Sequence, residues 1–110
     1  METNHALASL SALGQDTRLD VFRLLVKAGT DGMLAGEIGQ ALDVRQNTLS
    51  ANLSILLNAG LVRNQREGRA IRYFADMDGM RALLAFLMED CCQGDPLLCA
   101  DFSEIAACKP

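Results

Sequence analysis

Hydrophobic residues recur at helical spacing through the first half of the chain and divide it into four segments. Apolar side chains at every third or fourth position are typical of amphipathic helices. Glycines and short polar stretches separate the segments, and residues of this kind end helices. The pattern therefore predicts helices over Thr3–Leu13, from Asp16 to about Ala28, over about Ala35–Leu42 and over about Arg45–Ala59.

Each helix has a further signal in the sequence. In the first, Leu7, Leu10 and Leu13 share one side. Asp16 is a good N-cap for the second. That second helix has the broad apolar face expected of a core helix, made of Leu19, Val21, Phe22, Leu24, Leu25 and Val26. Ile38 and Leu42 should point inward from the third helix, and Gly60 should close the fourth as the glycine that follows many helix ends.

Two short strands follow the fourth helix. The segments Leu61–Arg66 and Arg69–Ala75 flank Glu67-Gly68, the kind of two-residue connection that closes a β-hairpin. A short helix, a tight turn, a second helix and a hairpin follow one another in a winged helix-turn-helix. The predicted fold is therefore mainly α with a two-stranded hairpin, arranged as a winged helix-turn-helix.

A last helix over about Asp78–Cys92 is apolar nearly all round. A domain of this size has too little protein left to cover that surface, and large apolar patches rarely stay exposed. We therefore expect a homodimer formed through the first and last helices. Residues 1–92 would form the winged helix-turn-helix and dimerisation domain, and residues 93–110 a cysteine-containing tail.

The composition fits one folded domain, since half of the 110 residues are apolar and 22% are charged. No stretch approaches the roughly 18 consecutive apolar residues of a membrane span, and the N-terminus lacks the features of a secretory signal. We therefore expect a cytoplasmic protein without a membrane partner. In a reducing compartment, the four cysteines are better suited to reactivity or metal binding than to disulfides.

The distribution of charge indicates a polyanionic partner. The whole chain has a net charge of −4, yet the stretch from Arg45 to Phe74 holds five arginines and a single acidic residue, Glu67. A basic third can dock on a polyanion while the acidic remainder suppresses non-specific binding. Double-stranded operator DNA is the polyanion that a winged helix-turn-helix would bind.

The fourth helix and the hairpin carry the candidate DNA contacts. Leu49, Leu53 and Leu56 form the inward stripe of the helix, and its other side holds amides and hydroxyls that can reach base edges and phosphates. An ordinary solvated helix face would look similar. The candidate DNA-binding residues are Arg45, Gln46, Asn47, Thr48 and Ser50 on the helix and Arg66, Arg69 and Arg72 in the hairpin.

The predicted turn places like charges opposite each other in the hairpin. With Glu67-Gly68 as the loop, Arg66 faces Arg69, and Arg63 faces Arg72. Because facing like charges destabilise a strand pair, we expect anions such as phosphates between them. The alternative is a hairpin that its charge merely keeps soluble.

Several motifs in order resemble the ArsR/SmtB family of metalloregulatory repressors. They are Thr17-Arg18-Leu19, Gln46-Asn47-Thr48-Leu49-Ser50-Ala51-Asn52-Leu53, Ala59-Gly60-Leu61-Val62, Arg66-Glu67-Gly68-Arg69 and Tyr73, within about residues 10–92. The resemblance implies a homodimeric winged helix that represses transcription at a palindromic operator and leaves it when an inducer binds. Where the family usually has Ser-x-His-Leu, this chain has Asn52. No contact is therefore assigned to Asn52 by inheritance.

The cysteines are the candidate inducer site. The third helix lacks the cysteine pair that family members often carry there, and with His5 as the only histidine the last helix has a poor set of zinc ligands. Cys91, Cys92 and Cys99 remain, the last of them behind a Gly-x-Pro turn. Three thiolates are a soft set that suits trivalent arsenic or antimony. The run also resembles the C-terminal Cys-Cys…Cys arsenite site of one branch of the ArsR repressors.

The sequence thus predicts a DNA-binding repressor without a required cofactor, released from its operator when arsenite or antimonite binds Cys91, Cys92 and Cys99. A sensor of oxidants or reactive sulfur on the same fold is the alternative, and a methylated arsenical would need only two of the thiolates. Cys99 can act in its own subunit or in its partner's, and Cys108 is left out of the site. The cysteines could also be buried hydrophobes of the dimer helix. A thiol enzyme of the arsenate reductase type is rejected, because no arginine follows Cys91.

Overall fold

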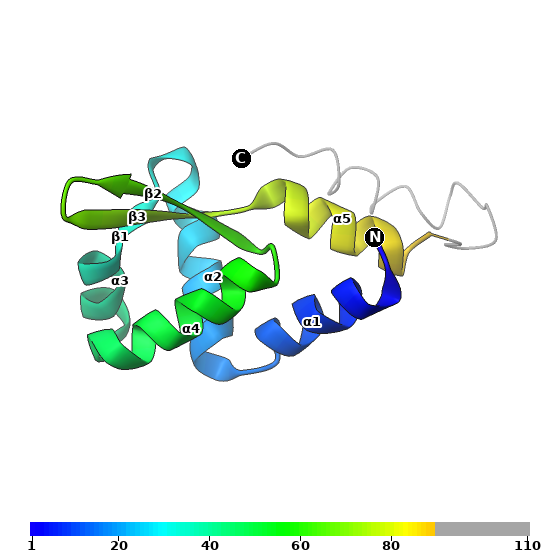
Figure 1. Cartoon of the computed structure of the whole chain (residues 1–110), viewed down its shortest axis with the longest axis horizontal. Coiled ribbons are helices and arrows are strands. Elements are labelled where there is room, and N and C mark those ends of the chain that lie inside the picture. Colours follow the sequence, from blue (N-terminus) through cyan, green and yellow to red (C-terminus); the bar gives the residue numbers. More distant parts are fainter. Residues whose placement is uncertain (90–110) are drawn as a thin grey trace.

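The computed structural model describes residues 1–89, which form helices and one small antiparallel sheet (Figure 1). In chain order the elements are α1 (Thr3–Leu13), α2 (Asp16–Ala28), the 3₁₀ turn η1 (Gly29–Asp31), β1 (Met33–Leu34), α3 (Ala35–Leu42), α4 (Gln46–Asn58), β2 (Val62–Glu67), β3 (Ala70–Ala75) and α5 (Met77–Leu87). This order confirms the predicted mainly helical winged helix-turn-helix. The first four predicted helices agree with α1 to α4 to within one residue at each end.

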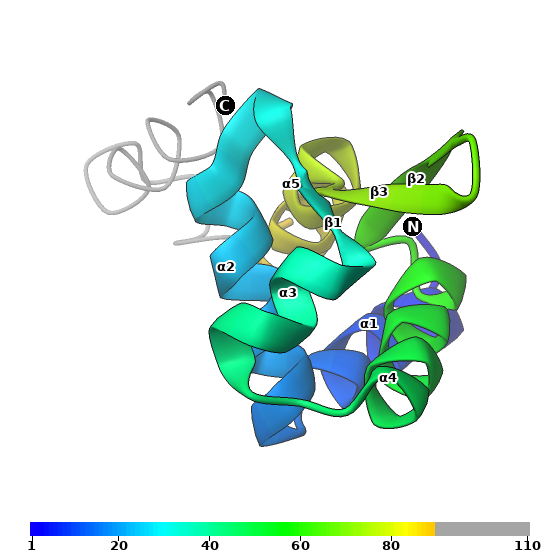
Figure 2. The ribbon, with the colours of Figure 1, turned by 90° about the vertical axis from the view of Figure 1, so that its left-hand side faces the viewer.

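The elements separate into two ends of the molecule. We call the β2–β3 hairpin the wing. The helices α3 and α4 lie at one end of the molecule together with the tip of the wing, while α1 and α5 lie toward the other end (Figure 1). Seen from the first end, α3 and α4 stand in front and the wing projects beside them (Figure 2). The helix α2 passes between the two ends. A surface made by α4 and the wing is therefore separate from one made by α1 and α5.

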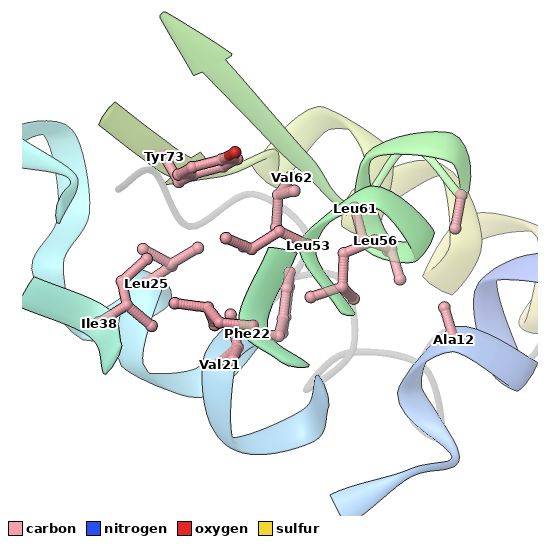
Figure 3. Packing of buried hydrophobic residues seen from close by; sticks show 12 residues of the cluster. Ala12, Val21, Phe22, Leu25, Ile38, Leu53, Leu56, Leu61, Val62 and Tyr73 are labelled. Carbon is pink, nitrogen blue, oxygen red and sulfur yellow. The ribbon is translucent and has the colours of Figure 1, made fainter. Parts of the chain in front are cut away.

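The core forms where α2, α3, α4 and the wing meet, and their side chains point toward one another (Figure 3). Leu25, Ile38, Leu49 and Leu56 are 0% exposed. Removing a buried leucine of this kind costs about 2–5 kcal/mol of folding free energy. The predicted inward residues are thus confirmed, and Leu42 is half-buried against the same cluster.

The outer faces of α1 and α2 depart from a simple apolar pattern. The small residues Ala6, Ser9 and Ala12 are the buried ones on α1, whereas Leu7 and Leu10 are 58% and 42% exposed. On α2 the core contacts come from Val21, Phe22 and Leu25. Leu19 and Val26 of the same helix stay exposed.

The start of α2 is capped by a different residue than predicted. Gln15 is the N-cap, and its side-chain oxygen accepts a hydrogen bond from the backbone N–H of Arg18 at 2.9 Å. Asp16 is the first residue of the helix, where its charge still favours the helix dipole. Because the amide of Gln15 reaches the third residue of the helix, it takes the capping role expected of Asp16.

The loop of the wing is Gly68-Arg69 and not Glu67-Gly68. Glu67 pairs with Ala70 across the strands, so the connection lies one residue later than predicted. Primed two-residue turns require a positive φ at their first central position. Gly68 supplies it with φ 63°, whereas a loop of Glu67-Gly68 would force that conformation on a glutamate.

The corrected register removes the predicted arginine pairs. Arg66 pairs with Ile71, and Arg63 pairs with Phe74. The prediction of arginines facing each other was therefore wrong, and the expectation of anions between them loses its basis. Sequence analysis also missed β1, a two-residue strand that adds to the free edge of β3 and gives the sheet order β1-β3-β2.

The last helix is shorter than predicted. It begins at Met77, with the Asp76 side chain accepting a hydrogen bond from the Gly79 N–H at 3.0 Å, and it ends at Leu87 instead of near Cys92. Glu89 follows its last turn, where negative charge is unfavourable to the helix dipole. The rest of the predicted helix, the tail 93–110 and all four cysteines lie outside the described residues.

Candidate nucleic-acid interface

The polar side of α4 is exposed along its first two turns. Arg45 stands at the N-cap, with Asn47, Thr48 and Ser50 following it on the helix, and all four are exposed. The side chain of Asn47 bonds locally, since its Oδ1 accepts a hydrogen bond from the Thr48 N–H at 2.8 Å. A helix with exposed amides and hydroxyls on one side and a buried stripe on the other is suited to lie in a major groove.

Gln46 has a structural role in the turn between α3 and α4. Its Nε2 donates a hydrogen bond to the carbonyl oxygen of Ala35, the first residue of α3, at 3.3 Å. The same amide lies against Gly39, where an added Cβ would collide with it. Gln46 is therefore exposed and at the predicted interface, but its side chain also bonds α4 to α3.

The wing presents two of its predicted contacts at its tip. Arg66 and Arg69 are exposed, and Arg69 belongs to the turn itself. Because side chains alternate along a strand, Arg66 shares a face of the sheet with Ile71 and Tyr73. That face is the one turned toward α3 and α4, since Ile71 and Tyr73 line the groove described below.

Arg72 is held within the wing by other protein groups. Its Nε bonds to Glu67 Oε2 at 2.8 Å and its Nη1 donates to the carbonyl oxygen of Asp31 at 3.2 Å. The hydrogen bond to Glu67 raises the pKa of Arg72 above its ordinary value. Arg63 lies on the same face, with its guanidinium 4.5 Å from the centroid of the Phe74 ring. Of the predicted wing contacts, Arg72 is thus the one whose side chain is already hydrogen-bonded to other groups of the same chain.

A groove of about 570 Å³ runs between α3, α4 and the wing. Its polar lining comes from Glu37 and Gln40 of α3, Ser50 of α4 and Arg69 of the wing. Sequence analysis predicted neither of the two α3 residues as part of the site. Glu37 and Gln40 lie three residues apart, and this spacing places them on one side of α3. The Glu37 side chain caps α3 by accepting a hydrogen bond from the Leu34 N–H at 2.8 Å. The groove therefore connects the exposed side of α4 to the wing tip.

The predicted metal ligands cannot be placed on this fold. Cys91, Cys92 and Cys99 lie outside the described residues, and within residues 1–89 no group of His, Cys, Asp and Glu is arranged to hold a metal ion. Over the same residues, no helix is long and apolar enough to cross a membrane.

A family model described as a helix-turn-helix domain matches residues 13–65, which run from the end of α1 into β2. A relative from Halobacterium salinarum, assigned by name as an arsenical resistance operon repressor, ArsR, is 37% identical over 76 residues. That match covers 69% of this chain and 58% of the relative. A second repressor of this kind from the same organism matches over 66% of its length, so the chain spans less than two thirds of the curated relatives it matches.

Solved structures of similar proteins agree with the fold. An ArsR-like transcriptional regulator from Rhodococcus superposes with a TM-score of 0.71 at 25% identity, over 94% of this chain and 93% of the other. A homodimeric winged helix-turn-helix DNA-binding domain from Mycobacterium bovis gives 0.64 at 28% identity, over 79% and 81%. Fold, matched family model and relatives agree: the chain belongs to the ArsR family of helix-turn-helix transcriptional regulators, which bind DNA and are not enzymes.

Proposed function

We propose that this chain is a homodimeric transcriptional repressor that binds operator DNA with α4 and the wing. Ser50, on the exposed polar side of α4, and Arg69, at the wing tip, border one groove, and this juxtaposition is the observation that carries the proposal. In this arrangement α4 enters the major groove as the recognition helix, and Arg66 and Arg69 contact phosphates beside it. Named repressors among the relatives support the same assignment.

The second copy of the chain covers α1 and α5. Leu7, Leu10 and Leu87 are 58%, 42% and 49% exposed, and they belong to the two helices that lie away from the wing (Figure 1). Apolar side chains of this size on neighbouring helices are typical of an interface between subunits. The homodimeric Mycobacterium bovis domain supports this proposal. A symmetric dimer presents two recognition helices to two half-sites about one helical turn apart.

The inducer in this proposal is trivalent arsenic or antimony, bound by the thiolates of Cys91, Cys92 and Cys99. The soft ligand set supports this choice, as does the arsenical resistance named for the two Halobacterium relatives. The three cysteines follow α5 in the sequence, within twelve residues of its end at Leu87. Metalloid binding would therefore act on the end of a helix that we place in the dimer interface.

The contacts at the end of α4 offer a route from the interface to DNA. Gly79 of α5 packs so closely on the carbonyl oxygen of Gly60 that an added Cβ would collide with it. The oxygen of Ala59, one residue earlier, accepts hydrogen bonds from α1. A shift of α1 and α5 would thus move the recognition helix. Coupling free energies of about 1–3 kcal/mol between two sites are typical of such systems.

The repressor claim is tested by footprinting the purified chain on the DNA upstream of its own gene. A symmetric protected region with half-sites about one helical turn apart is expected, at concentrations far below those that cover unrelated DNA. Asn47→Ala and Thr48→Ala should abolish the footprint. Asn58→Ala, at the far end of the same helix, is the matched control. Equal coverage of all DNA by the unaltered chain would contradict the proposal.

A further inference from the structure

The side chain of Arg18 connects three helices. Arg18 lies in the first turn of α2, and its Nε donates a hydrogen bond to the carbonyl oxygen of Ala12 in α1 at 2.7 Å. Its Nη1 donates to Oδ1 of Asn52 in α4 at 3.1 Å. The planar guanidinium holds its donors in a fixed geometry, so two bonds to two helices fix those helices relative to each other.

Asn52 receives this bond on the core side of the recognition helix. It is only 8% exposed, and its neighbours Leu49 and Leu53 belong to the buried stripe. A buried amide needs a hydrogen-bond partner, and Arg18 supplies a charged one. Asn52 is thus buried, and it lies one helical turn after the exposed Thr48 on the same helix, so a bond to Asn52 acts close to the candidate base contacts.

We propose that Arg18 is a positioning residue that sets the rotation of α4 for sequence-specific DNA recognition. The inference rests on the proposed function, because it requires α4 to read DNA. Arg18 touches no base itself, and it acts by holding Asn52 against the end of α1. Loss of the link would let α4 turn about its axis and misalign the side chains that read base edges. Contacts to phosphates, which carry no sequence information, would largely survive.

The same link joins the recognition helix to the subunit interface. Ala12 ends the buried side of α1, and α1 is one of the helices that we place in the dimer. Arg18 therefore fixes α4 to the scaffold that sets the spacing of the two half-sites. An arginine at this position thus contributes to specificity through geometry and not through its charge on DNA.

The test measures binding of Arg18→Gln to operator DNA and to unrelated DNA of equal length over a range of salt concentrations. Operator affinity should fall at least tenfold, affinity for unrelated DNA should change less than about twofold, and the salt dependence should stay the same. Arg23→Gln, an exposed arginine on the same helix, is the matched control and should behave as the unaltered chain. Arg18→Lys should recover only part of the loss, because lysine lacks the planar fork.

If Arg18→Gln does not fold, two variants of Asn52, the residue that accepts the bond, still test the proposal. Asn52→Leu fills a similar buried volume without an acceptor and should lose specificity, whereas Asn52→Asp keeps the bond and should retain it. Unchanged operator specificity in a folded Arg18→Gln or Asn52→Leu overturns the inference. A weaker salt dependence in Arg18→Gln also overturns it, because that result makes Arg18 a phosphate contact. If the unaltered chain itself does not distinguish operator from unrelated DNA, it is the proposed function that fails.

Discussion

Ser9 Oγ donates a hydrogen bond to the carbonyl oxygen of Ala59 at 3.2 Å and so joins the middle of α1 to the C-terminal end of α4. Ser9 is 1% exposed, and the Nε2 atom of His5 lies 3.2 Å from the same oxygen. The oxygen of Ala59 lies beyond the helical hydrogen bonds of α4, because the last carbonyls of a helix have no partner within it. The α1 helix therefore both packs against α4 and supplies a hydrogen-bond donor to the carbonyl group at its C-terminal end.

Replacing Ser9 by alanine should lower the free energy of unfolding by about 1 kcal/mol. The change removes one donor to a buried carbonyl and leaves little empty space. Ser11→Ala, at an exposed position on the same helix, should change stability by less than about 0.5 kcal/mol. Urea unfolding followed by circular dichroism measures both. Equal midpoints for the two variants would contradict a structural role for the Ser9 bond.

Gly79→Ala should destabilise the fold by about 1–3 kcal/mol. An added Cβ at position 79 would collide with the backbone oxygen of Gly60, so α5 would have to move away from the end of α4. Gly36→Ala in α3 is the matched control, because nothing lies within 4 Å of a Cβ added there. That control should leave stability unchanged or raise it, since alanine favours helices over glycine. Thermal melts of both variants provide the comparison, and a stable Gly79→Ala would refute the close packing of α5.

Arg66→Ala and Arg69→Ala should each weaken the salt dependence of DNA binding. The slope of log K against log salt concentration should shrink by about 0.9 for each phosphate that an arginine no longer neutralises, which means one phosphate for each protomer of the dimer. Affinity for operator and for unrelated DNA should fall together, because phosphates carry no sequence information. Binding isotherms at several salt concentrations measure the slope.

Arg63→Ala is the control for the wing, because this arginine lies on the opposite face of the sheet over Phe74. Its slope should match that of the unaltered chain. Arg72→Ala should have a smaller effect than Arg69→Ala, since Glu67 and Asp31 already engage the guanidinium of Arg72. If Arg63→Ala reduced the salt-dependence slope as much as Arg69→Ala does, the DNA would lie on the face of the wing that carries Arg63, and the proposed orientation would be contradicted.

Leu10→Glu should convert the dimer into a monomer. The substitution puts a charge on the face of α1 that we place in the interface, and burying an unpaired carboxylate is strongly unfavourable. Leu19→Glu on α2 changes a leucine of nearly equal exposure, 41% against 42%, outside that face and should leave the dimer intact. Analytical ultracentrifugation distinguishes the two. A dimer that persists in Leu10→Glu and dissociates in Leu19→Glu would move the interface to α2.

Sequence periodicity predicted the first four helices well, and the buried stripe of α4 shows why. Leu49, Leu53 and Leu56 repeat at helical spacing, so a helix places all three on one side, where they are buried. Glycine also marked the ends reliably. Gly60 has φ 77° after α4, a conformation that other residues adopt with strain.

Sequence analysis missed the register of the wing, although the turn preference of Gly68 is a local signal, and it missed features set by single long-range contacts. The register of the wing depends on whether Gly68 takes the first or the second loop position, and one residue of shift moves every side chain to the other face. The strand β1 exists only because Met33 pairs with Tyr73. Likewise, the bond between Arg18 and Asn52 spans 34 residues and has no local signal. Sequence patterns therefore predicted the residues of a candidate interface and missed the contacts that fix its parts.

The most direct test of the account is an anaerobic titration of the reduced protein, bound to its upstream DNA, with arsenite, zinc and a polysulfide in parallel. Arsenite should release the DNA, and Cys91→Ser, Cys92→Ser and Cys99→Ser should each abolish release while leaving DNA affinity within about twofold of the unaltered chain. Cys108→Ser is the matched control and should respond as the unaltered chain does. Release by the polysulfide alone, or by arsenite in all three serine variants, would contradict a metalloid site at these cysteines.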